Sequence, residues 1–199
     1  NGATIDKYMG DAIMAFWNAP IDMPDHRKRA GESVLGMLAA LEKLNASLER
    51  PVRIGVGLNS GVCCVGNLGS RQRFDYSAIG DPVNLASRVE GLTKLYGLSN
   101  LLTASTAEGL ADLALVEVDL VAVVGRDEPT AVYTILGGPE VAASPDFLAF
   151  RDEHGLFLAA YRGRQFEAAA ERLRGLRQAA PAQFAKVYDE YAQRLAIFA

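Results

Sequence analysis

Apolar runs of two different periods alternate along the first 137 residues, and this alternation restricts the fold more than any other feature. Short runs rich in Val, Ile and Phe predict strands, whereas apolar residues at every third or fourth position predict helices. The pair Gly10-Asp11 joins two strand-like runs as a hairpin turn. Because strands and helices alternate irregularly and include hairpins, we expect an α+β fold, with a mainly antiparallel sheet and helices packed on it.

Cap and turn residues give the expected bounds of the helices. One helix should start after Asp25 as its N-cap and end at Pro51. A second has Asp81 as N-cap, Pro82 as first helical residue and Gly97 after its last turn. The other expected elements are strands within 3–17, two β-branched runs about a Gly-containing turn in 52–70, a loop entering a short strand at 71–80, a short strand at 100–105, a short helix at 106–113 and a closing pair of strands at 113–125 and 130–138.

The chain changes character after residue 137. Residues 138–145 are rich in small residues and prolines, which is typical of a linker. Residues 146–199 predict an all-helical C-terminal tail, and the spacing of Phe166, Ala169, Leu173 and Pro181 resembles half of a tetratricopeptide repeat. One such unit cannot bury its own apolar face. The tail must therefore contact the preceding domain, a second copy of the chain, or a protein partner.

Composition limits the classes of function. Half of the 199 residues are apolar and the net charge is -4, which argues against a nucleic-acid binder. No run of about 18 apolar residues predicts a membrane span. Cys63 and Cys64 are adjacent, so they point to opposite faces of a strand, and we expect both to be reduced. We expect a cytoplasmic protein, and attachment to a membrane through a segment upstream stays open.

Three polar groups occur where a core would contain none. Lys7 and Asp11 interrupt the first two strand-like runs. Asn84 and Arg88 are four residues apart, so they share a face in the first turns of the expected helix, where backbone N–H groups favour anions. Arg126 follows a glycine between two strands. Taken singly, each has a plain structural explanation as a turn residue or a solvated charge.

Together, the order and spacing of these groups resemble the class III nucleotidyl cyclases, most closely the bacterial adenylate cyclases. The similar stretches are IDKYMGDAIMAFWNAP, GLNSGVCCVGNLGSRQRFDYSAIGDPVNLASRVEGLTKLYG and VVGRDEPTAVYTILG. The resemblance covers residues 1–137, and an N-terminal part of that domain is expected to be missing. It implies a ferredoxin-like palm core that converts ATP to 3′,5′-cyclic AMP and pyrophosphate at a homodimer interface.

The resemblance also implies a role for each polar group at the start of the site. Asp11 corresponds to a ligand of the two Mg²⁺ or Mn²⁺ ions that assist attack of the ribose 3′-oxygen on the α-phosphate. Lys7 corresponds to the lysine that reads adenine. Its partner in base recognition falls at Ser77, where adenylate cyclases usually have Thr or Asp, and Ser keeps the hydroxyl of Thr.

The remaining implied roles concern the sugar and the phosphates. Asn84 corresponds to the residue that orients the ribose, and Arg88 to the residue that stabilises charge on the reacting phosphate. Arg126 corresponds to a basic residue on the terminal phosphates, where a guanidinium can bind in a bidentate manner.

One feature departs from the family. The second metal carboxylate of the family belongs to a strand upstream of residue 1, and Asp6 is not expected to replace it, because it should point to the opposite face from Lys7. A cyclase-like module that binds nucleotide or a partner without turnover therefore remains an alternative, and a guanylate cyclase is a lesser one. A diguanylate cyclase would lack its Gly-Gly-Asp/Glu-Glu-Phe signature here.

Overall fold

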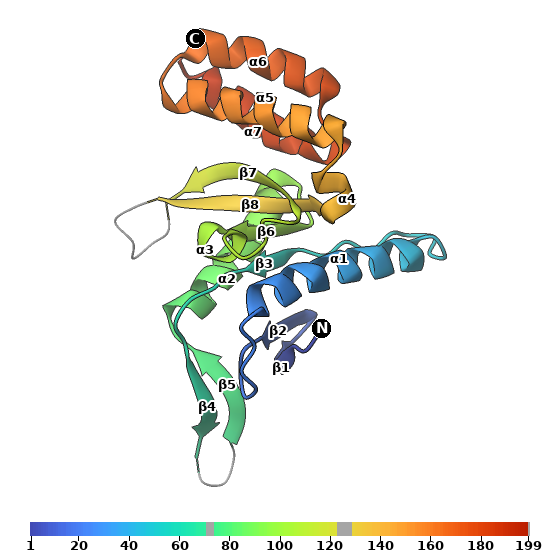
Figure 1. Ribbon diagram of the computed structural model, residues 1–199, viewed down its shortest axis with the longest axis vertical. Coiled ribbons are helices and arrows are strands. Elements are labelled where there is room, and N and C mark those ends of the chain that lie inside the picture. The colour runs from blue at the N-terminus through green and yellow to red at the C-terminus, as the bar shows by residue number, and fades with distance from the viewer. Residues whose placement is uncertain (71–73, 123–128, 199) are drawn as a thin grey trace.

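The structure is a computed structural model that describes residues 1–70, 74–122 and 129–198. The chain is elongated, with the two β-hairpins at one end, a sheet in the middle and the last helices at the other end (Figure 1). The strands are β1 (Thr4–Met9), β2 (Ala12–Phe16), β3 (Val56–Leu58), β4 (Cys64–Gly69), β5 (Phe74–Ile79), β6 (Asn100–Thr103), β7 (Ala114–Val121) and β8 (Thr130–Gly137). The helices are α1 (His26–Asn45), α2 (Asp81–Tyr96), α3 (Ala104–Ala107), α4 (Pro139–Ala142), α5 (Pro145–Arg162), α6 (Phe166–Ala179) and α7 (Ala185–Leu195), with a 3₁₀ turn at Ala182–Phe184.

The strands form one sheet of four and two separate hairpins. The sheet has the order β3-β6-β8-β7, in which β3 and β6 are parallel and the other pairs are antiparallel. The hairpins are β1-β2 and β4-β5. The predicted α+β class with a mainly antiparallel sheet is confirmed. The predicted turn at Gly10-Asp11 is also confirmed, and Gly10 adopts a φ of 65° there.

The two β-branched runs of residues 52–70 form strands, but these strands do not pair with each other. β3 pairs with β6 and β4 pairs with β5. The residues between them bond elsewhere: the Asn59 amide donates to the Pro82 carbonyl at 2.9 Å, and Asn59 Oδ1 accepts from the Thr103 hydroxyl at 2.7 Å. Asn59 thus joins the sheet to the first turn of α2 instead of closing a hairpin.

Helix α2 begins one residue earlier than its cap signature predicts. Its N-cap is Gly80 at a φ of 145°, so Asp81 is the first helical residue and not the cap. That backbone conformation is open to glycine and costly for residues with a Cβ, which explains the shift. The predicted end is confirmed, because Gly97 follows Tyr96 in the left-handed conformation with a φ of 69°.

Two glycines of the β3 segment let α2 pack closely against the sheet. A Cβ added to Gly57 would lie 2.3 Å from the Ala86 carbonyl oxygen and 2.4 Å from the Glu90 nitrogen. A Cβ on Gly55 would lie 2.4 Å from the Thr93 hydroxyl. The absence of side chains at these two positions therefore sets the distance between the strand and the helix.

Helix α1 starts after Asp25 as predicted but ends well before Pro51. The Asp25 carboxylate pairs with Arg29 instead of capping the backbone. The last helical residue is Asn45, whose side chain exchanges two hydrogen bonds of 2.8 and 2.9 Å with the main chain of Val52. The predicted end of the helix at Pro51 is therefore wrong. The helix ends before the proline, because the Asn45 side chain binds the main chain where it returns at Val52.

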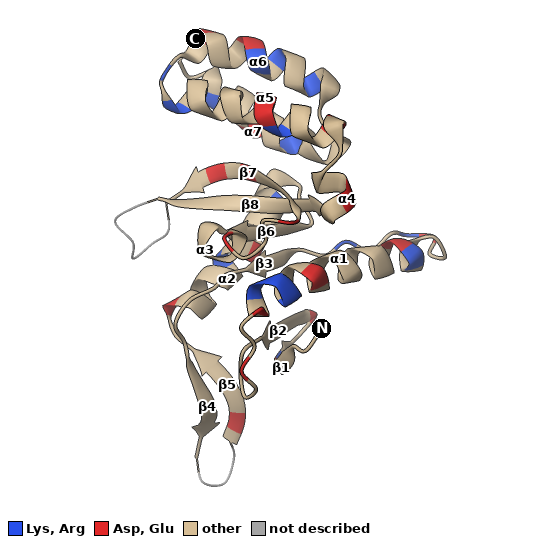
Figure 2. Cartoon of the chain, viewed as in Figure 1, with Lys and Arg blue, Asp and Glu red and all other residues tan. Residues whose placement is uncertain are grey.

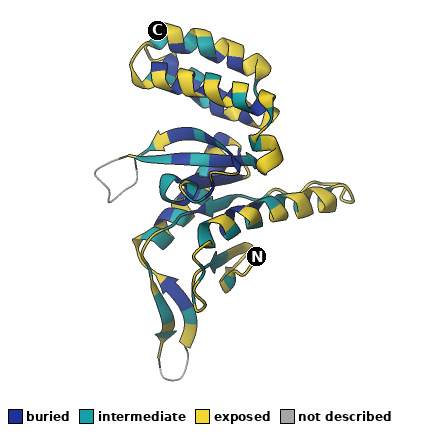
Figure 3. Cartoon of the chain, viewed as in Figure 1, coloured by how far each residue is buried: buried dark blue, intermediate teal, exposed yellow. Residues whose placement is uncertain are grey.

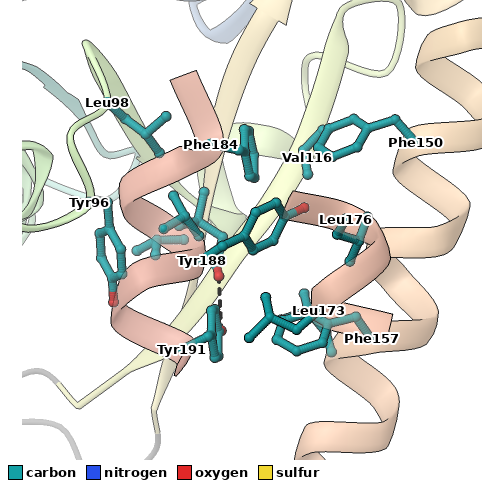
Figure 4. Close-up of a cluster of buried hydrophobic side chains, with 14 of the residues drawn as sticks. Tyr96, Leu98, Val116, Phe150, Phe157, Leu173, Leu176, Phe184, Tyr188 and Tyr191 are labelled. Atoms are coloured by element: carbon teal, nitrogen blue, oxygen red, sulfur yellow. Dashed lines mark hydrogen bonds between the residues drawn. The ribbon is translucent and has the colours of Figure 1, made fainter. Parts of the chain in front are cut away.

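The tail helices pack on the preceding sheet. Buried side chains of α2, β6, β7 and β8 form one core with those of α5, α6 and α7 (Figure 4). Phe157, Tyr188 and Tyr191 lie at its centre, and the ring centroids of Phe157 and Tyr191 are 5.0 Å apart at an interplanar angle of 90°. The tail could contact the preceding domain, a second copy of the chain or a protein partner, and the structure shows that it packs on the preceding domain. The expected linker contains α4.

Polar contacts also connect the tail to the sheet. The Asp119 carboxylate on β7 accepts from the hydroxyls of Tyr96 and Tyr191 at 2.6 and 2.9 Å, and from the Arg194 guanidinium at 2.6 Å. One buried carboxylate thus joins α2, β7 and α7. Charges of both signs are spread over the tail helices (Figure 2), and Arg162 pairs with Glu117 of β7 at 2.6 Å.

A buried histidine lies at the same boundary. His154 Nε2 is 2.7 Å from the Glu117 carbonyl oxygen, which can only accept, so this nitrogen carries the proton. Nδ1 then accepts from the Tyr188 hydroxyl at 3.0 Å. Burial lowers the pKa of His154 to about 4, against the opposing effect of the Glu117 hydrogen bond.

Among the described residues, no helix is both long and apolar enough to cross a membrane.

Candidate functional site

The first part of the site is a β-bulge in β1. The β1-β2 register runs from Ile5 opposite Ala15 to Lys7 opposite Met14, so Asp6 is the extra residue. A bulge lets neighbouring side chains turn to the same side. Lys7 Nζ is 3.2 Å from Asp6 Oδ1, and both side chains reach Ser77. The prediction that Asp6 points away from Lys7 is therefore wrong, because regular alternation fails at this residue.

Ser77 lies at the centre of this cluster. It is only 4% exposed, and its hydroxyl donates to Asp6 Oδ2 at 2.6 Å. Lys7 Nζ donates to Ser77 Oγ at 3.1 Å, and the Ala78 N–H donates to Asp6 Oδ2 at 3.3 Å. β1 and β5 thus bring Lys7 and Ser77 into contact within one chain. We call Asp6, Lys7 and Ser77 the base-end cluster, after the role in base recognition that the family resemblance implies for Lys7 and Ser77.

The protonation of this cluster follows from its contacts. Burial of the Asp6 carboxyl acts to raise its pKa, but the hydrogen bond from Ser77 and the ammonium group of Lys7 nearby outweigh burial and hold the pKa below its ordinary value. The side chain of Asp6 is fully buried, whereas that of Lys7 is 43% exposed. The cluster therefore holds a buried carboxylate beneath an ammonium group that reaches the surface.

Helix α2 presents the second group of predicted residues. Asn84 and Arg88 are exposed and one turn apart, next to the buried Leu85 and Val89 that fix the helix on the sheet. They share one face of the helix, as the spacing predicts, and the structure places this face beside the buried one. The first turn of α2 is held by the hydrogen bond from Asn59 to the Pro82 carbonyl.

Asp11 lies at the exposed tip of the β1-β2 hairpin. Neither Asp11 nor Asn84 makes a side-chain hydrogen bond or ion pair with another described residue. Among the described residues, no group of three or more His, Cys, Asp or Glu could hold a metal ion. These residues do not by themselves fit a two-ion centre, and Asp11 is left as a single candidate ligand.

Arg126 lies outside the described residues, between the end of β7 and the start of β8. The structure therefore gives no position for Arg126, the last basic residue of the predicted set. Lys7 and Ser77 meet directly, Asn84 and Arg88 share one helix face, and Asp11 lies on the same hairpin as Lys7.

Two residues of the site were missed by sequence reasoning. Asp6 was excluded because a bulge cannot be recognised from alternation alone, although an acid beside Lys7 in an apolar strand is an unusual feature. Asn59 was read as part of a turn. Its neighbours in sequence, Asn-Ser-Gly, are typical turn residues and give no sign of the contact with α2.

Large apolar side chains are exposed on both hairpins. Taken as whole residues, all of β1 and β2 are half-buried or exposed, as Figure 3 shows, although the Asp6 side chain itself is buried. Tyr8 is 72% exposed and Ile13 is 60% exposed on the first hairpin, and Phe74 is 60% exposed on the second. Exposed apolar surface of this extent is typical of protein–protein contact.

Comparisons with known proteins place these observations in a family. The family described as the adenylate and guanylate cyclase catalytic domain matches residues 5–137. An adenylate cyclase of Anabaena cylindrica is 36% identical over 148 residues, which cover 67% of this chain and 28% of that protein. The chain thus spans less than a third of the length of that curated relative.

Solved structures give the same result for the fold. The guanylate cyclase domain of RhGC from Catenaria anguillulae in complex with GTP is 26% identical with a TM-score of 0.59, over 68% of this chain and 73% of that one. The adenylyl cyclase CyaB from P. aeruginosa is 29% identical with a TM-score of 0.57, over 68% and 72%. The family match covers more than half of this chain, so the chain belongs to the adenylate and guanylate cyclase catalytic domain family.

Proposed function

We propose that residues 1–137 are the catalytic part of an adenylate cyclase, which converts ATP to 3′,5′-cyclic AMP and pyrophosphate. The observation that carries this proposal is the contact of 3.1 Å between Lys7 Nζ and Ser77 Oγ. It joins an ammonium donor and a hydroxyl oxygen at one point. Adenine needs a donor at N1 and an acceptor at N6, and guanine needs the reverse.

Asn84 and Arg88 then act on the sugar and the phosphates. In the proposed reaction the ribose 3′-oxygen forms a bond to the α-phosphorus, and the bond from that phosphorus to the pyrophosphate oxygen breaks. The 3′-hydroxyl proton leaves to water. Asn84 orients the ribose by hydrogen bonds, and Arg88 stabilises the negative charge on the reacting phosphate. Arg126 binds the terminal phosphates.

Divalent ions are part of this proposal as well. Asp11 would be one carboxylate ligand of two Mg²⁺ or Mn²⁺ ions, whose positive charge favours attack at phosphorus. We assign no step to these ions, because the described residues lack a carboxylate cluster that could hold them.

We also propose that the site lies between two copies of the chain. The apolar side chains exposed on the β1-β2 and β4-β5 hairpins support this, since a second copy would cover them. Asp11 of one copy would then face the base-end cluster, Asn84 and Arg88 of the other. An isologous interface of this kind creates two equivalent sites. The tail of residues 146–199 follows the linker 138–145 and supports the catalytic part through their shared core.

A module that binds nucleotide without turnover is the second candidate. The absence of a carboxylate cluster among the described residues favours it. The test incubates the intact protein with ATP and Mn²⁺ and measures cyclic AMP by chromatography, beside Asn84→Ala and a control, Asp112→Asn, at a surface ion pair with Lys28. The proposal expects activity in the native protein and the control and little in Asn84→Ala. Binding of ATP with no product would favour the module.

A further inference from the structure

Asp6 contacts both other residues of the base-end cluster, although regular alternation along β1 predicts that it points away from Lys7. We propose that Asp6 determines the base preference of the site by fixing the direction of the Ser77 hydrogen bond, so that adenine is accepted and guanine is disfavoured. This inference rests on the proposed function, because it names the base that the same site accepts. Asp6 would act as a positioning residue, since it reaches the base only through Ser77 and Lys7.

The direction of the Ser77 hydroxyl follows from its partners. A serine hydroxyl has one proton to donate and two lone pairs to accept with. An ionised carboxylate only accepts, so the proton of Ser77 points to Asp6 Oδ2 at 2.6 Å. Lys7 only donates, so it occupies one lone pair at 3.1 Å. The one position that remains on Ser77 is an acceptor.

The same count applies to Lys7. Its ammonium group has three protons, of which one points to Ser77, and it lies 3.2 Å from Asp6 Oδ1 as an ion pair without a hydrogen bond. A donor therefore remains for a nucleotide. The cluster therefore offers a nucleotide one donor beside one acceptor, in a fixed order. Adenine N1 accepts and its N6 donates, so both positions are matched.

Guanine meets this order reversed. Its O6 would face the acceptor of Ser77, and its N1–H would face the ammonium group. If guanine shifts until O6 meets Lys7, its N1–H moves away from Ser77. The acceptor position of Ser77 is then left without a hydrogen-bond partner. Without Asp6 the hydroxyl could rotate and donate to O6. The buried carboxylate prevents this rotation, because its own hydrogen bond would be lost in a place that water does not reach.

The experiment measures the ATP:GTP ratio of kcat/KM for the intact native protein, Asp6→Ala, Ser77→Ala and the double variant of these two changes. Each single change should lower the ratio about 10-fold, the discrimination expected from one mismatched hydrogen bond. The double variant should lower it no further, since Asp6 acts through Ser77. Asp112→Asn, which also removes an aspartate paired with a lysine, should leave the ratio unchanged.

Several results would overturn the inference. An unchanged ratio in Asp6→Ala would do so, and so would a double variant whose ratio falls by the product of the two single effects. Asp6→Asn provides a second variant: its amide oxygen can still accept from Ser77, so its ratio must lie closer to the native value than that of Asp6→Ala. Equilibrium dialysis of ATP and GTP gives the same comparison from dissociation constants. Nucleotide binding without turnover would refute the cyclase reaction and still test Asp6, whereas binding of neither nucleotide would refute both.

Discussion

Replacing Gly57 with alanine should move the helix that carries Asn84 and Arg88. The added Cβ would lie 2.3 Å from the Ala86 carbonyl oxygen and 2.4 Å from the Glu90 nitrogen. Both contacts are with backbone atoms, so no side chain can rotate away. Restoring ordinary contact of 3.4 Å requires α2 to retreat from β3 by about 1 Å.

This displacement has two measurable consequences. Forcing one extra methyl group into a packed core typically costs about 1–3 kcal/mol, so the free energy of unfolding should fall by that amount. A displacement of about 1 Å at groups that hold the substrate typically costs about 100-fold in rate. We therefore expect kcat/KM to fall about 100-fold in Gly57→Ala, although the residue itself lies under the helix and not in the site.

Gly91→Ala is the matched control. Gly91 lies on α2, and its added Cβ would have no heavy atom within 4 Å beyond its chain neighbours and the backbone of its own helix turn. Alanine there should raise the free energy of unfolding by about 0.5–1 kcal/mol through helix propensity. Denaturant unfolding and initial rates with ATP measure both variants. If Gly57→Ala is as stable and as active as Gly91→Ala, the close approach of β3 and α2 does not position the site.

Three further changes test other parts of the account. Asp119→Ala should lower the free energy of unfolding by about 3–5 kcal/mol, because the Arg194 guanidinium loses its buried partner charge and the Tyr96 hydroxyl loses its acceptor. Asp119→Asn, which keeps an acceptor, should cost less in the same denaturant titration. Burial lowers the pKa of His154 from 6.5 to about 4, so the unfolded state takes up this proton at a higher pH than the folded state does. The free energy of unfolding should therefore fall by about 2–4 kcal/mol as the pH drops from 6.5 to 4, and His154→Gln should lose this part of the pH dependence. Asp11→Ala and Asn84→Ala should each be nearly inactive, yet a mixture should regain activity if the site lies between two chains, and a mixture as inactive as its parts would contradict that arrangement.

Local sequence signals predicted the elements that depend on local chemistry. Gly10-Asp11 gave the hairpin turn, and Pro82 with Gly97 gave α2 to within one residue. That Asn84 and Arg88 share one face of that helix also follows from spacing alone, because a helix repeats every 3.6 residues.

Features set by distant contacts could not be predicted in this way. The parallel pairing of β3 with β6 depends on the side-chain bonds of Asn59, which span 23 and 44 residues. The bulge at Asp6 depends on Ser77, which lies 71 residues away. Packing of the tail on the sheet was one of several possibilities, and the choice depends on how the apolar faces of both fit together.

The central claim is that the base-end cluster and α2 form the site of an adenylate cyclase. The most direct test gives the intact protein ATP or GTP with Mn²⁺ and measures cyclic nucleotide and pyrophosphate together. The account predicts equal amounts of cyclic AMP and pyrophosphate from ATP, and a rate with GTP that is roughly 10- to 100-fold lower. Cyclic GMP formed as fast as cyclic AMP, or release of phosphate without any cyclic product, would contradict it.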